Sequence, residues 1–595
     1  MAAKASADKR RRSKTDLDYA TGQIRSSLLV LAIFSFAINL LMLTSPLYML
    51  QVYDRVLVSG RVETLVMLTV LAGSALLVLG VLDSLRSSVM VRMGCWLNDR
   101  LGPVLISGGV RARLVGDNAG AQPLRDLAQV QSFLSSQGLA ALFDAPWTPV
   151  FLALIWLLHP ALGTLAVGAA LLLALLTLLN ELTTRSASQT ASTKQIAAFQ
   201  QAESTIRNAE VVRAMGMLPG LLERWRASND SSLSATLSSA ERGAAILGIT
   251  KFLRFFVQSA TLGLGAYLVL KGEVSGGAMI ASSILLGRAL APIEVAMGSW
   301  RNFLATRIAY DRLRLRLQSI PAEAQRTRLP EPYGHISLKH VSYSAPGTKA
   351  HVIDNVSFHL TPGEALAVIG PSASGKSTLC RLIGGIAAPS GGEIRLDGSE
   401  LHHWDPEQLG RYVGYLPQDV ELFSGSIRDN ISRMAMADDD DVVQAAMLAH
   451  AHEMIQRLPQ GYETPIGDAG ARLSGGQRQR IGLARAVFGN PKIIILDEPN
   501  ANLDQSGETA LAAAVRALKE RGAALMIVGH RPSTLAQADK ILFLRDGRVE
   551  LFGAREDVLG KLRLAGGESK RQEPQLRNAA AAPPRMPRVT EMIGE

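Results

Sequence analysis

The chain has 595 residues, of which 48% are hydrophobic and 19% are charged, and its formal net charge is +10. This length exceeds that of one ordinary domain, and the composition is more apolar than that of most soluble enzymes. We therefore expect a membrane part joined to a soluble part. The excess positive charge is expected to flank membrane segments rather than to bind nucleic acid.

The first residues form a basic arm, expected over 1–27, which contains the sequence KRRRSK. The apolar run behind it is too long for a cleavable signal peptide. The two cysteines, Cys95 and Cys380, fall in segments expected in the cytoplasm. The sequence therefore favours neither a disulfide framework nor a zinc site.

Six helices are predicted to cross the bilayer within a transmembrane domain over 28–310, because about 20 apolar residues span its hydrocarbon core. The charge-free run 145–180 is long enough for two helices, which His159 and Pro160 divide as a tight hairpin. The last span is rich in small residues, which favour close helix packing in lipid. The predicted spans are 28–50, 64–82, 139–158, 161–180, 252–270 and 275–297.

Lysine and arginine are distributed unevenly between the connecting loops. The basic arm holds seven, and the loops 83–138 and 181–251 hold six and eight. The opposite loops, 51–63, 159–160 and 271–274, hold two, none and one. The positive-inside rule therefore predicts that both termini and the two long loops are cytoplasmic.

The two long loops have a helical pattern and exceed the length that a connection between packed helices needs. We expect the spans to continue through them as long helices and to contact another part of the molecule through Asp126–Leu134 and Asn208–Met217. The stretch PLYMLQVYDRVLVSG, residues 46–60, is expected to be the first outer turn. In it, Asp54 and Arg55 would face water or each other.

After residue 310 the pattern changes to short β-branched runs separated by helical segments: HISLKHVSY, EALAVIG, GEIRLDG, KIIILDE and ALMIVGH. This alternation predicts an α/β domain with a largely parallel sheet. The expected boundaries are a linker over 311–335, the α/β domain over 336–560 and a disordered tail over 561–595. The fold class is thus an all-α domain of six transmembrane helices fused to an α/β domain.

A phosphate-binding loop follows the run EALAVI, where GPSASGKST fits the pattern G-x-x-x-x-G-K-S between a strand and a helix. Its glycines let backbone N–H groups surround phosphates, and the helix N-terminus adds a positive dipole end. Lys376 would reach the β- and γ-phosphates of ATP, and Ser377 would supply a hydroxyl to Mg²⁺. The predicted ATP-binding residues of this loop are Gly370, Ser372, Gly375, Lys376, Ser377 and Thr378.

Two adjacent carboxylates end the apolar run KIIILDE. Strand packing does not require such a pair at a sheet edge, whereas phosphoryl transfer uses one carboxylate near Mg²⁺ and one near the attacking water. We expect Asp497 to serve the metal and Glu498 to act as the catalytic base.

The segment RLSGGQRQRIGLARAVFGNP contains LSGGQ, residues 473–477. This signature, with the P-loop, resembles that of ATP-binding cassette (ABC) proteins. The resemblance implies that Tyr343 stacks on adenine and that Asp504 lies in the loop that crosses the dimer. It also implies that Gln418 senses the γ-phosphate and ligates Mg²⁺ and that His530 contacts the γ-phosphate, so that both act with Glu498 in catalysis. The α/β domain is thus expected to be a P-loop ATPase domain. The resemblance further implies that a second copy of the chain completes each site, and that the residues capping the partner's ATP are Ser474, Gly475, Gly476 and Gln477.

Five further stretches look like those of type I secretion exporters of the protease-type branch: PLYMLQVYDRVL, LFDAPWTPVF, ILLGRALAPIE, HEMIQRLPQGYET and LDEPNANLD. The resemblance implies a homodimer in the bacterial inner membrane that secretes an unfolded polypeptide with a C-terminal signal. It also implies two partners, a periplasmic membrane-fusion adaptor and a TolC-type outer-membrane channel. Some relatives carry an N-terminal peptidase domain, which we do not expect here. Where relatives usually have Glu before the signature, this chain has Asp468.

Three questions stay open from the sequence. Arg288 interrupts the last span, and it would either line the translocation path or form an internal ion pair with Glu294 or Asp144. The alternative cargo is a lipid or small amphiphile. A further alternative is an ATP-regulated channel or signalling module, which the intact set Lys376, Glu498, Gln418 and His530 disfavours.

Overall fold

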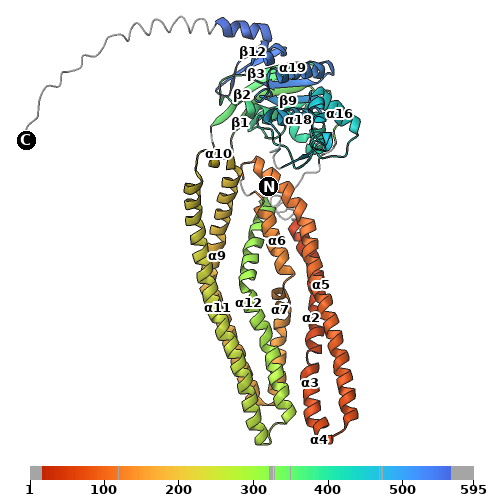
Figure 1. Ribbon diagram of the computed structural model, residues 1–595, viewed down its shortest axis with the longest axis vertical. Helices are drawn as coiled ribbons and strands as arrows, with labels where there is room; N and C mark the ends of the chain where they lie inside the picture. Colours follow the sequence, from red (N-terminus) through yellow and green to blue (C-terminus); the bar gives the residue numbers. More distant parts are fainter. Residues whose placement is uncertain are drawn as a thin grey trace, which may run out of the picture. The chain divides into compact units, whose positions relative to one another are not determined.

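The computed structural model describes residues 16–117, 120–319, 326, 328–348, 350–467, 470 and 473–564. The chain divides into two compact units, coloured red to green and green to blue in Figure 1. The helical unit comprises Met1–Arg113 and Asp117–Ala322, and the α/β unit comprises Leu114–Gly116 and Glu323–Glu595.

The helical unit contains six helical stretches that are long and apolar enough to cross a membrane: Arg25–Ser59, Val62–Leu114, Gln137–Leu158, Pro160–Thr184, Leu218–Leu270 and Gly276–Gln318. Each overlaps one predicted span, so the prediction of six transmembrane helices is confirmed. The helices are α2 (Asp16–Leu41), α3 (Thr44–Gln51), α4 (Leu57–Ser59), α5 (Val62–Leu114), α6 (Gln122–Leu134), α7 (Gln137–Asp144), α8 (Thr148–Leu158), α9 (Pro160–Arg207), α10 (Ala209–Ala214), α11 (Leu218–Leu270) and α12 (Gly276–Ser319).

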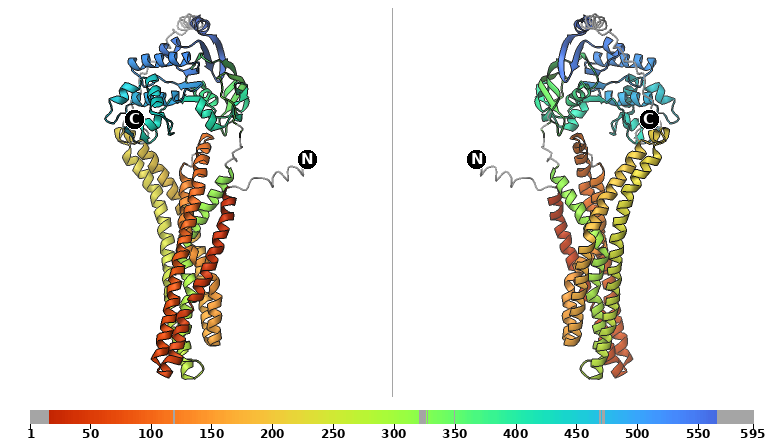
Figure 2. Two further views of the ribbon diagram at one scale, coloured as in Figure 1. Left: turned by 90° about the vertical axis from the view of Figure 1, so that its right-hand side faces the viewer. Right: turned by 90° about the vertical axis from the view of Figure 1, so that its left-hand side faces the viewer.

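Four of these helices are much longer than a bilayer requires. Helices α5 and α11 have 53 residues each, α9 has 48 and α12 has 44, whereas about 20 residues cross the hydrocarbon core. The prediction that the spans continue as long helices is confirmed, and α9 and α11 run side by side in Figures 1 and 2.

Two helices extend past expected domain boundaries, which themselves stay predictions. Helix α2 already begins at Asp16, inside the arm expected over 1–27, and α12 continues to Ser319, inside the linker expected over 311–335. Charged residues limit the part of a helix that can lie in hydrocarbon, but the helix itself can continue through them into water.

The predicted hairpin between α8 and α9 is confirmed at His159. This residue is extended (φ −164°, ψ 133°), and its Nδ1 accepts a hydrogen bond from the N–H of Ala161 at 3.1 Å. Pro160 follows as the first residue of α9, where its missing N–H has no intrahelical role. The two helices pack closely, since a Cβ added to Gly163 would lie 2.7 Å from Trp156.

The first outer turn is helical, because a π-helical turn, η1 (Val52–Val56), joins α3 to α4. The carboxylate of Asp54 accepts hydrogen bonds from Ser275 Oγ at 2.6 Å and from the N–H of Gly277 at 2.9 Å. Asp54 thus binds the N-terminal turn of α12, where free N–H groups favour a negative charge. Asp54 is half-buried, and among the described residues it forms no ion pair with Arg55, so the expected contact between the two is not found.

The α/β unit is built on a six-stranded sheet in the order β12-β11-β3-β10-β9-β6. All neighbouring strands are parallel except β11 and β12. Strands β9 and β10 are buried along their whole length, as a sheet covered on both faces requires. The strands are β3 (Ala365–Ile369), β6 (Val413–Leu416), β9 (Ile493–Asp497), β10 (Ala524–Val528), β11 (Lys540–Arg545) and β12 (Arg548–Ala554).

Two of the runs assigned to this parallel sheet belong to another sheet. HISLKHVSY overlaps β1 (Ile336–Ser344) and GEIRLDG overlaps β4 (Gly391–Leu396), and the two strands pair antiparallel in the sheet β2-β1-β4-β5. Burial along β2 (His351–Leu360) largely alternates, as it does when one sheet face is open to solvent. The expectation of a single, largely parallel sheet is therefore corrected. The remaining strands are β5 (Ser399–Glu400), β7 (Gly425–Ser426) and β8 (Pro465–Ile466).

Helices of the α/β unit pack on two apolar cores. They are α13 (Lys376–Ile383), α14 (Pro406–Tyr412), α15 (Ile427–Ile431), α16 (Asp439–Leu448), α17 (His452–Gln456), α18 (Gly475–Val487), α19 (Gln505–Glu520) and α20 (Pro532–Ala536). A further helix over 555–564 enters the tail expected from residue 561, and the rest of that tail lies outside the described residues.

Candidate functional site

The site is formed where four parallel strands end at one edge of the central sheet. Val368 of β3, Val528 of β10 and Asp497 of β9 lie side by side in register. Leu416 of β6 pairs with Leu496 of β9. Because ligands of open α/β sheets bind beyond the carboxyl ends of the strands, the residues that follow these four strands meet at one place.

The loop after β3 has a backbone that only glycine fits at two positions. Gly370 (φ 154°) and Gly375 (φ 99°) both have positive φ. An added Cβ would lie 2.0 Å from the carbonyl oxygen of Leu544 at the first, and 2.7 Å from Ile353 at the second. The tight loop leads directly into α13, whose N-terminus offers N–H groups to an anion.

The side chains of this loop fit the predicted phosphate site. The ammonium of Lys376 donates to the carbonyl oxygens of Gly370 at 3.0 Å and Pro371 at 2.7 Å, so its charge lies against the loop. Ser377 and Thr378 follow in the first turn of α13 and are half-buried, and Ser372 is exposed.

Asp497 offers a place for a divalent cation. Its side chain is 2% exposed, and Oδ1 is buried without a hydrogen-bond partner among the described residues. Burial raises the pKa of this carboxyl above its usual value, and a hydrogen bond from Ser377 opposes that shift. A buried, unpaired carboxylate oxygen beside a hydroxyl is a suitable donor pair for Mg²⁺, a hard cation that prefers oxygen ligands.

Glu498 lies one residue beyond Asp497 in a left-handed backbone conformation, with φ 49°. Such a conformation costs a non-glycine residue about 1 kcal/mol and is typically retained at functional positions. Its N–H donates to the carbonyl oxygen of Val528 at 3.1 Å, and its carboxylate accepts from Gln418 Nε2 at 3.1 Å. The structure thus brings two of the three predicted catalytic residues, Gln418 and Glu498, into contact.

Tyr343 lies on β1, opposite Ile353 of β2. Ile353 in turn contacts the P-loop at Gly375. The ring of Tyr343 is half-buried against the second apolar core, and only one strand separates its backbone from the P-loop. Its expected stacking on adenine fits this placement.

The signature residues open helix α18 as a capping box. Ser474 Oγ accepts from the N–H of Gln477 at 3.3 Å, and the side chain of Gln477 accepts from the N–H of Ser474 at 2.8 Å. Gly475 and Gly476 pack against Asn502, where an added Cβ would come within 3.5 and 3.1 Å. A helix N-terminus of this kind offers N–H groups to an anion.

Asp504 caps the next helix, α19, through the N–H of Gly507 at 2.8 Å, and it lies 3.6 Å from Arg480 of α18. The hydrogen bond from the Gly507 backbone is the largest cause that lowers the pKa of Asp504. Among the described residues, no hydrogen bond or ion pair joins the signature residues or Asp504 to the P-loop. The predicted nucleotide residues therefore form two groups within one chain.

His530 follows β10 at the same sheet edge and is exposed. Within the described part of the chain, its imidazole makes no hydrogen bond. Sequence reasoning missed three polar residues near these groups, Ser374, Asn500 and Glu508. Ser374 is buried in the P-loop, with no partner for its Oγ among the described residues, and its serine spacing in GPSASGKST is the signal that could have found it.

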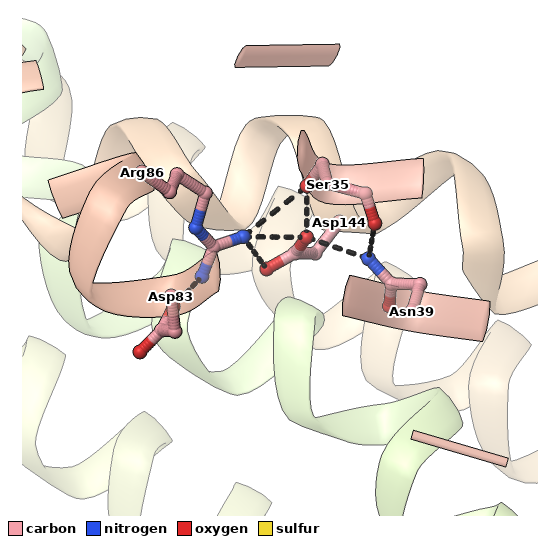
Figure 3. Close-up of polar contacts among 5 residues, drawn as sticks. All are labelled: Ser35, Asn39, Asp83, Arg86 and Asp144. Carbon is pink, nitrogen blue, oxygen red and sulfur yellow. Dashed lines mark hydrogen bonds and ion pairs between the residues drawn. The ribbon is translucent and has the colours of Figure 1, made fainter. Parts of the chain in front are cut away.

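A buried polar cluster in the helical unit was also missed (Figure 3). Arg86 of α5 donates through Nη1 to both carboxylate oxygens of Asp144, at 3.0 and 3.1 Å, and through Nη2 to Asp83 at 2.7 Å. Ser35 and Asn39 of α2 donate to the same Asp144 oxygen. The spacing of Ser35 and Asn39 by one helical turn within an apolar span was the available signal.

These contacts exclude the ion pairs considered for Arg288. Asp144 is bound to Arg86, and Glu294 is bound to Arg254 of α11. Arg288 itself is exposed on α12. The alternative of an internal pair with Glu294 or Asp144 is therefore wrong.

The predicted contact segments are helical, and Asp468 lies outside the described residues. Asp126–Leu134 belongs to α6, where the buried Asp126 binds Arg312 of α12 at 2.6 and 2.9 Å. Asn208–Met217 contains the short helix α10. What these segments touch outside the helical unit stays a prediction.

Comparison with known proteins gives two family matches. Residues 353–501 match the ABC transporter family, and residues 123–290 match the ABC transporter transmembrane region. In the solved structures, a bacterial Atm1-family ABC exporter with ATP bound has a TM-score of 0.78 at 22% identity, covering 92% of this chain and 98% of that one. This likeness shows the fold.

Curated relatives specify the group. The type I secretion system ATP-binding protein PrsD of Rhizobium meliloti is 41% identical over 543 residues, which are 90% of this chain and 93% of that protein. The leukotoxin translocation ATP-binding protein LktB of Mannheimia haemolytica is 31% identical over 552 residues, 89% of this chain and 75% of that protein. With its helical membrane unit and P-loop unit, this chain belongs to the ABC transporter family, as an ATPase of the type I secretion exporter group.

Proposed function

We propose that the protein secretes an unfolded polypeptide, driven by ATP hydrolysis. The observation that carries this proposal is the 41% identity to a type I secretion protein along 90% of the chain, which includes the helical unit as well as the ATPase unit. The ATPase unit alone would not indicate the cargo, since function depends on particular sites rather than on a fold.

The roles of the site residues follow from their chemistry. Lys376 neutralises charge on the β- and γ-phosphates, while Ser377, Gln418 and Asp497 hold Mg²⁺ directly or through water. Glu498 accepts a proton from the attacking water, and the amide of Gln418, 3.1 Å away, orients its carboxylate.

His530 would donate a hydrogen bond to the γ-phosphate, and Tyr343 would stack on adenine. Among the described residues, neither side chain forms a hydrogen bond with Gln418 or Glu498. Their contribution is therefore orientation of the nucleotide relative to the base and the metal.

A homodimer would complete the nucleotide sites. The signature residues and Asp504 form a group separate from the P-loop of the same chain, and each group presents a helix N-terminus suited to phosphate. Two chains paired head to tail would place one signature end over each P-loop. ATP would then hold the two ATPase units together until hydrolysis releases them.

The proposed location is the bacterial inner membrane, with both termini in the cytoplasm. The six spans and the excess of lysine and arginine in the arm and the long loops support this orientation. A periplasmic membrane-fusion adaptor and a TolC-type outer-membrane channel would continue the path. The cargo would carry its signal at its C-terminus.

Arg288 is the proposed marker of the path through the helical unit. It is exposed on α12, and the carboxylates of Asp144 and Glu294 are bound to other arginines. An ionised side chain at membrane depth faces water or a partner chain rather than lipid.

The experiment that tests this function compares wild type with Glu498→Gln. The variant should bind ATP with unchanged affinity and lose at least 90% of its turnover, because the amide cannot accept the proton of the attacking water (a general base contributes about 10²–10⁴-fold). ATPase rates in the presence of polypeptide or lipid then separate the two cargo classes. Stimulation by lipid and not by polypeptide would contradict the proposal.

A further inference from the structure

His530 has little side-chain support of its own. Its imidazole is exposed and makes no hydrogen bond to another described residue. Upstream, the loop is held to the sheet by the N–H of Gly529, which donates to the carbonyl oxygen of Val368 at 3.3 Å. The placement of His530 therefore depends on what holds the residues that follow it.

Glu508 of α19 holds those residues. Its carboxylate forms an ion pair with Arg531, the residue directly after His530, and accepts a hydrogen bond from Ser533 Oγ at 2.8 Å. Asn500 adds a second connection, because its Nδ2 donates to Thr534 Oγ1 at 3.2 Å. The hydrogen bond from Ser533 and the ion pair with Arg531 lower the pKa of Glu508, so it is charged at neutral pH.

The other end of this connection is Asp504. The N–H of Glu508 donates to the carbonyl oxygen of Asp504 at 2.9 Å, and the side chain of Asp504 accepts from the N–H of Gly507 at 2.8 Å. The two residues are thus joined across one hydrogen-bonded turn, the first turn of α19. A displacement of Asp504 carries Glu508 with it.

We infer that Glu508 is a positioning residue for ATP hydrolysis, which ties the His530 loop to the helical turn that begins at Asp504. The inference rests on the proposed role of His530 at the γ-phosphate. Glu508 does not touch nucleotide in this account. Glu508 determines the position of the His530 imidazole. It also makes that position depend on Asp504, which lies between the two nucleotide sites in the proposed dimer.

The first test is Glu508→Gln, which keeps the shape of the side chain and removes its charge. We expect kcat to fall about tenfold, the rate equivalent of one lost charge-assisted hydrogen bond. KM for ATP should stay unchanged, because the P-loop is untouched. The matched control is Glu520→Gln, an exposed glutamate at the end of the same helix with no partner among the described residues, and it should leave both constants unchanged.

The second test is a double-mutant cycle with His530→Ala. If Glu508 acts through His530, Glu508→Gln should cost about tenfold in wild type and nothing further in the His530→Ala background. Equal losses in both backgrounds would show a general structural role and overturn the inference. A third variant, Glu508→Arg with Arg531→Glu, reverses the ion pair and should recover part of the kcat lost in either single change.

The results distinguish the inference from the function it rests on. Normal kcat in His530→Ala would remove His530 from the γ-phosphate and contradict the proposed site. A large loss in His530→Ala together with normal kcat in Glu508→Gln would leave the site intact and overturn only the role of Glu508. No recovery in the charge-reversed pair, with normal thermal stability, would also count against it.

Discussion

Neighbouring carboxylates at the end of β9 have different surroundings, which suit them to different tasks. Asp497 is buried, and its pKa is raised by that burial, whereas Glu498 contacts the amide of Gln418. A metal can replace the solvent that Asp497 has lost, and this favours the charged form. Glu498 keeps access to the water that it would deprotonate.

Asp497→Asn should raise thermal stability when no metal is present. A carboxyl whose folded pKa exceeds its unfolded value stabilises the fold only while it is protonated, and that stability is lost as pH rises through the folded pKa. At neutral pH the buried charge therefore destabilises the metal-free protein, and the neutral amide should melt roughly 2 °C higher in EDTA.

The measurement is a melting curve at pH 7 with EDTA, and again with Mg²⁺ and ATP. Addition of Mg²⁺ and ATP should stabilise wild type more than Asp497→Asn. The control is Asp419→Asn, an exposed aspartate with no partner among the described residues. A lower melting temperature for Asp497→Asn in EDTA would contradict the account of its burial.

At the scale of elements, the polar cluster of Figure 3 joins three helical segments of the membrane unit. Asp144 ends α7 just before the 3-10 turn η2 (Ala145–Trp147), and Arg86 lies on the continuous helix α5. A buried guanidinium without its carboxylate costs far more than the pair contributes. The cluster therefore fixes the position of α5 relative to the span Gln137–Leu158, which the turn η2 interrupts.

Asp144→Asn should destabilise the helical unit, by about 3 kcal/mol if the buried Arg86 finds no other partner. Asp83→Asn is the matched control, since its carboxylate is half-exposed and contacts the same arginine. Yield after detergent purification and the melting temperature measure the effect. Equal values for the two variants would show that the cluster does not hold these helices.

Arg288→Ala should impair export more than ATP hydrolysis. Because Arg288 is exposed and the carboxylates of Asp144 and Glu294 bind other arginines, its removal should leave protein yield unchanged. Secreted cargo, ATPase rate and yield are compared for Arg288→Ala and Arg288→Lys, of which the second keeps the charge. Normal secretion by Arg288→Ala would remove this residue from the path.

Local sequence determines some elements of this structure and leaves others to tertiary contacts. Charge-free runs and the division at His159 located the spans, and the motifs GPSASGKST and KIIILDE located the strand ends that carry Lys376 and Glu498. Asp54 and Arg86 could not be placed in this way, because their partners lie 223 and 58 residues away. β1 and β4 were misassigned because a β-branched run does not specify the direction of its neighbour.

At the scale of the whole molecule, the proposed nucleotide sites require two chains. Mixing chains that carry Ser474→Arg with chains that carry Lys376→Ala should restore part of the ATPase activity. In the mixed dimer, one site carries both defects and the other carries neither. ATPase rates of the mixture and of each variant alone give the answer, and no recovery would count against sites completed by the partner, or would mean that both sites must work together.

The most direct test of the central claim is the set of proteins secreted into the medium by cells with wild type, with Glu498→Gln, or with no copy of the gene. Glu498→Gln protein should reach the membrane in normal amount, and the same polypeptides should disappear from the medium in this variant and in the deletion. An unchanged set of secreted polypeptides in both strains would contradict ATP-driven polypeptide export by this protein.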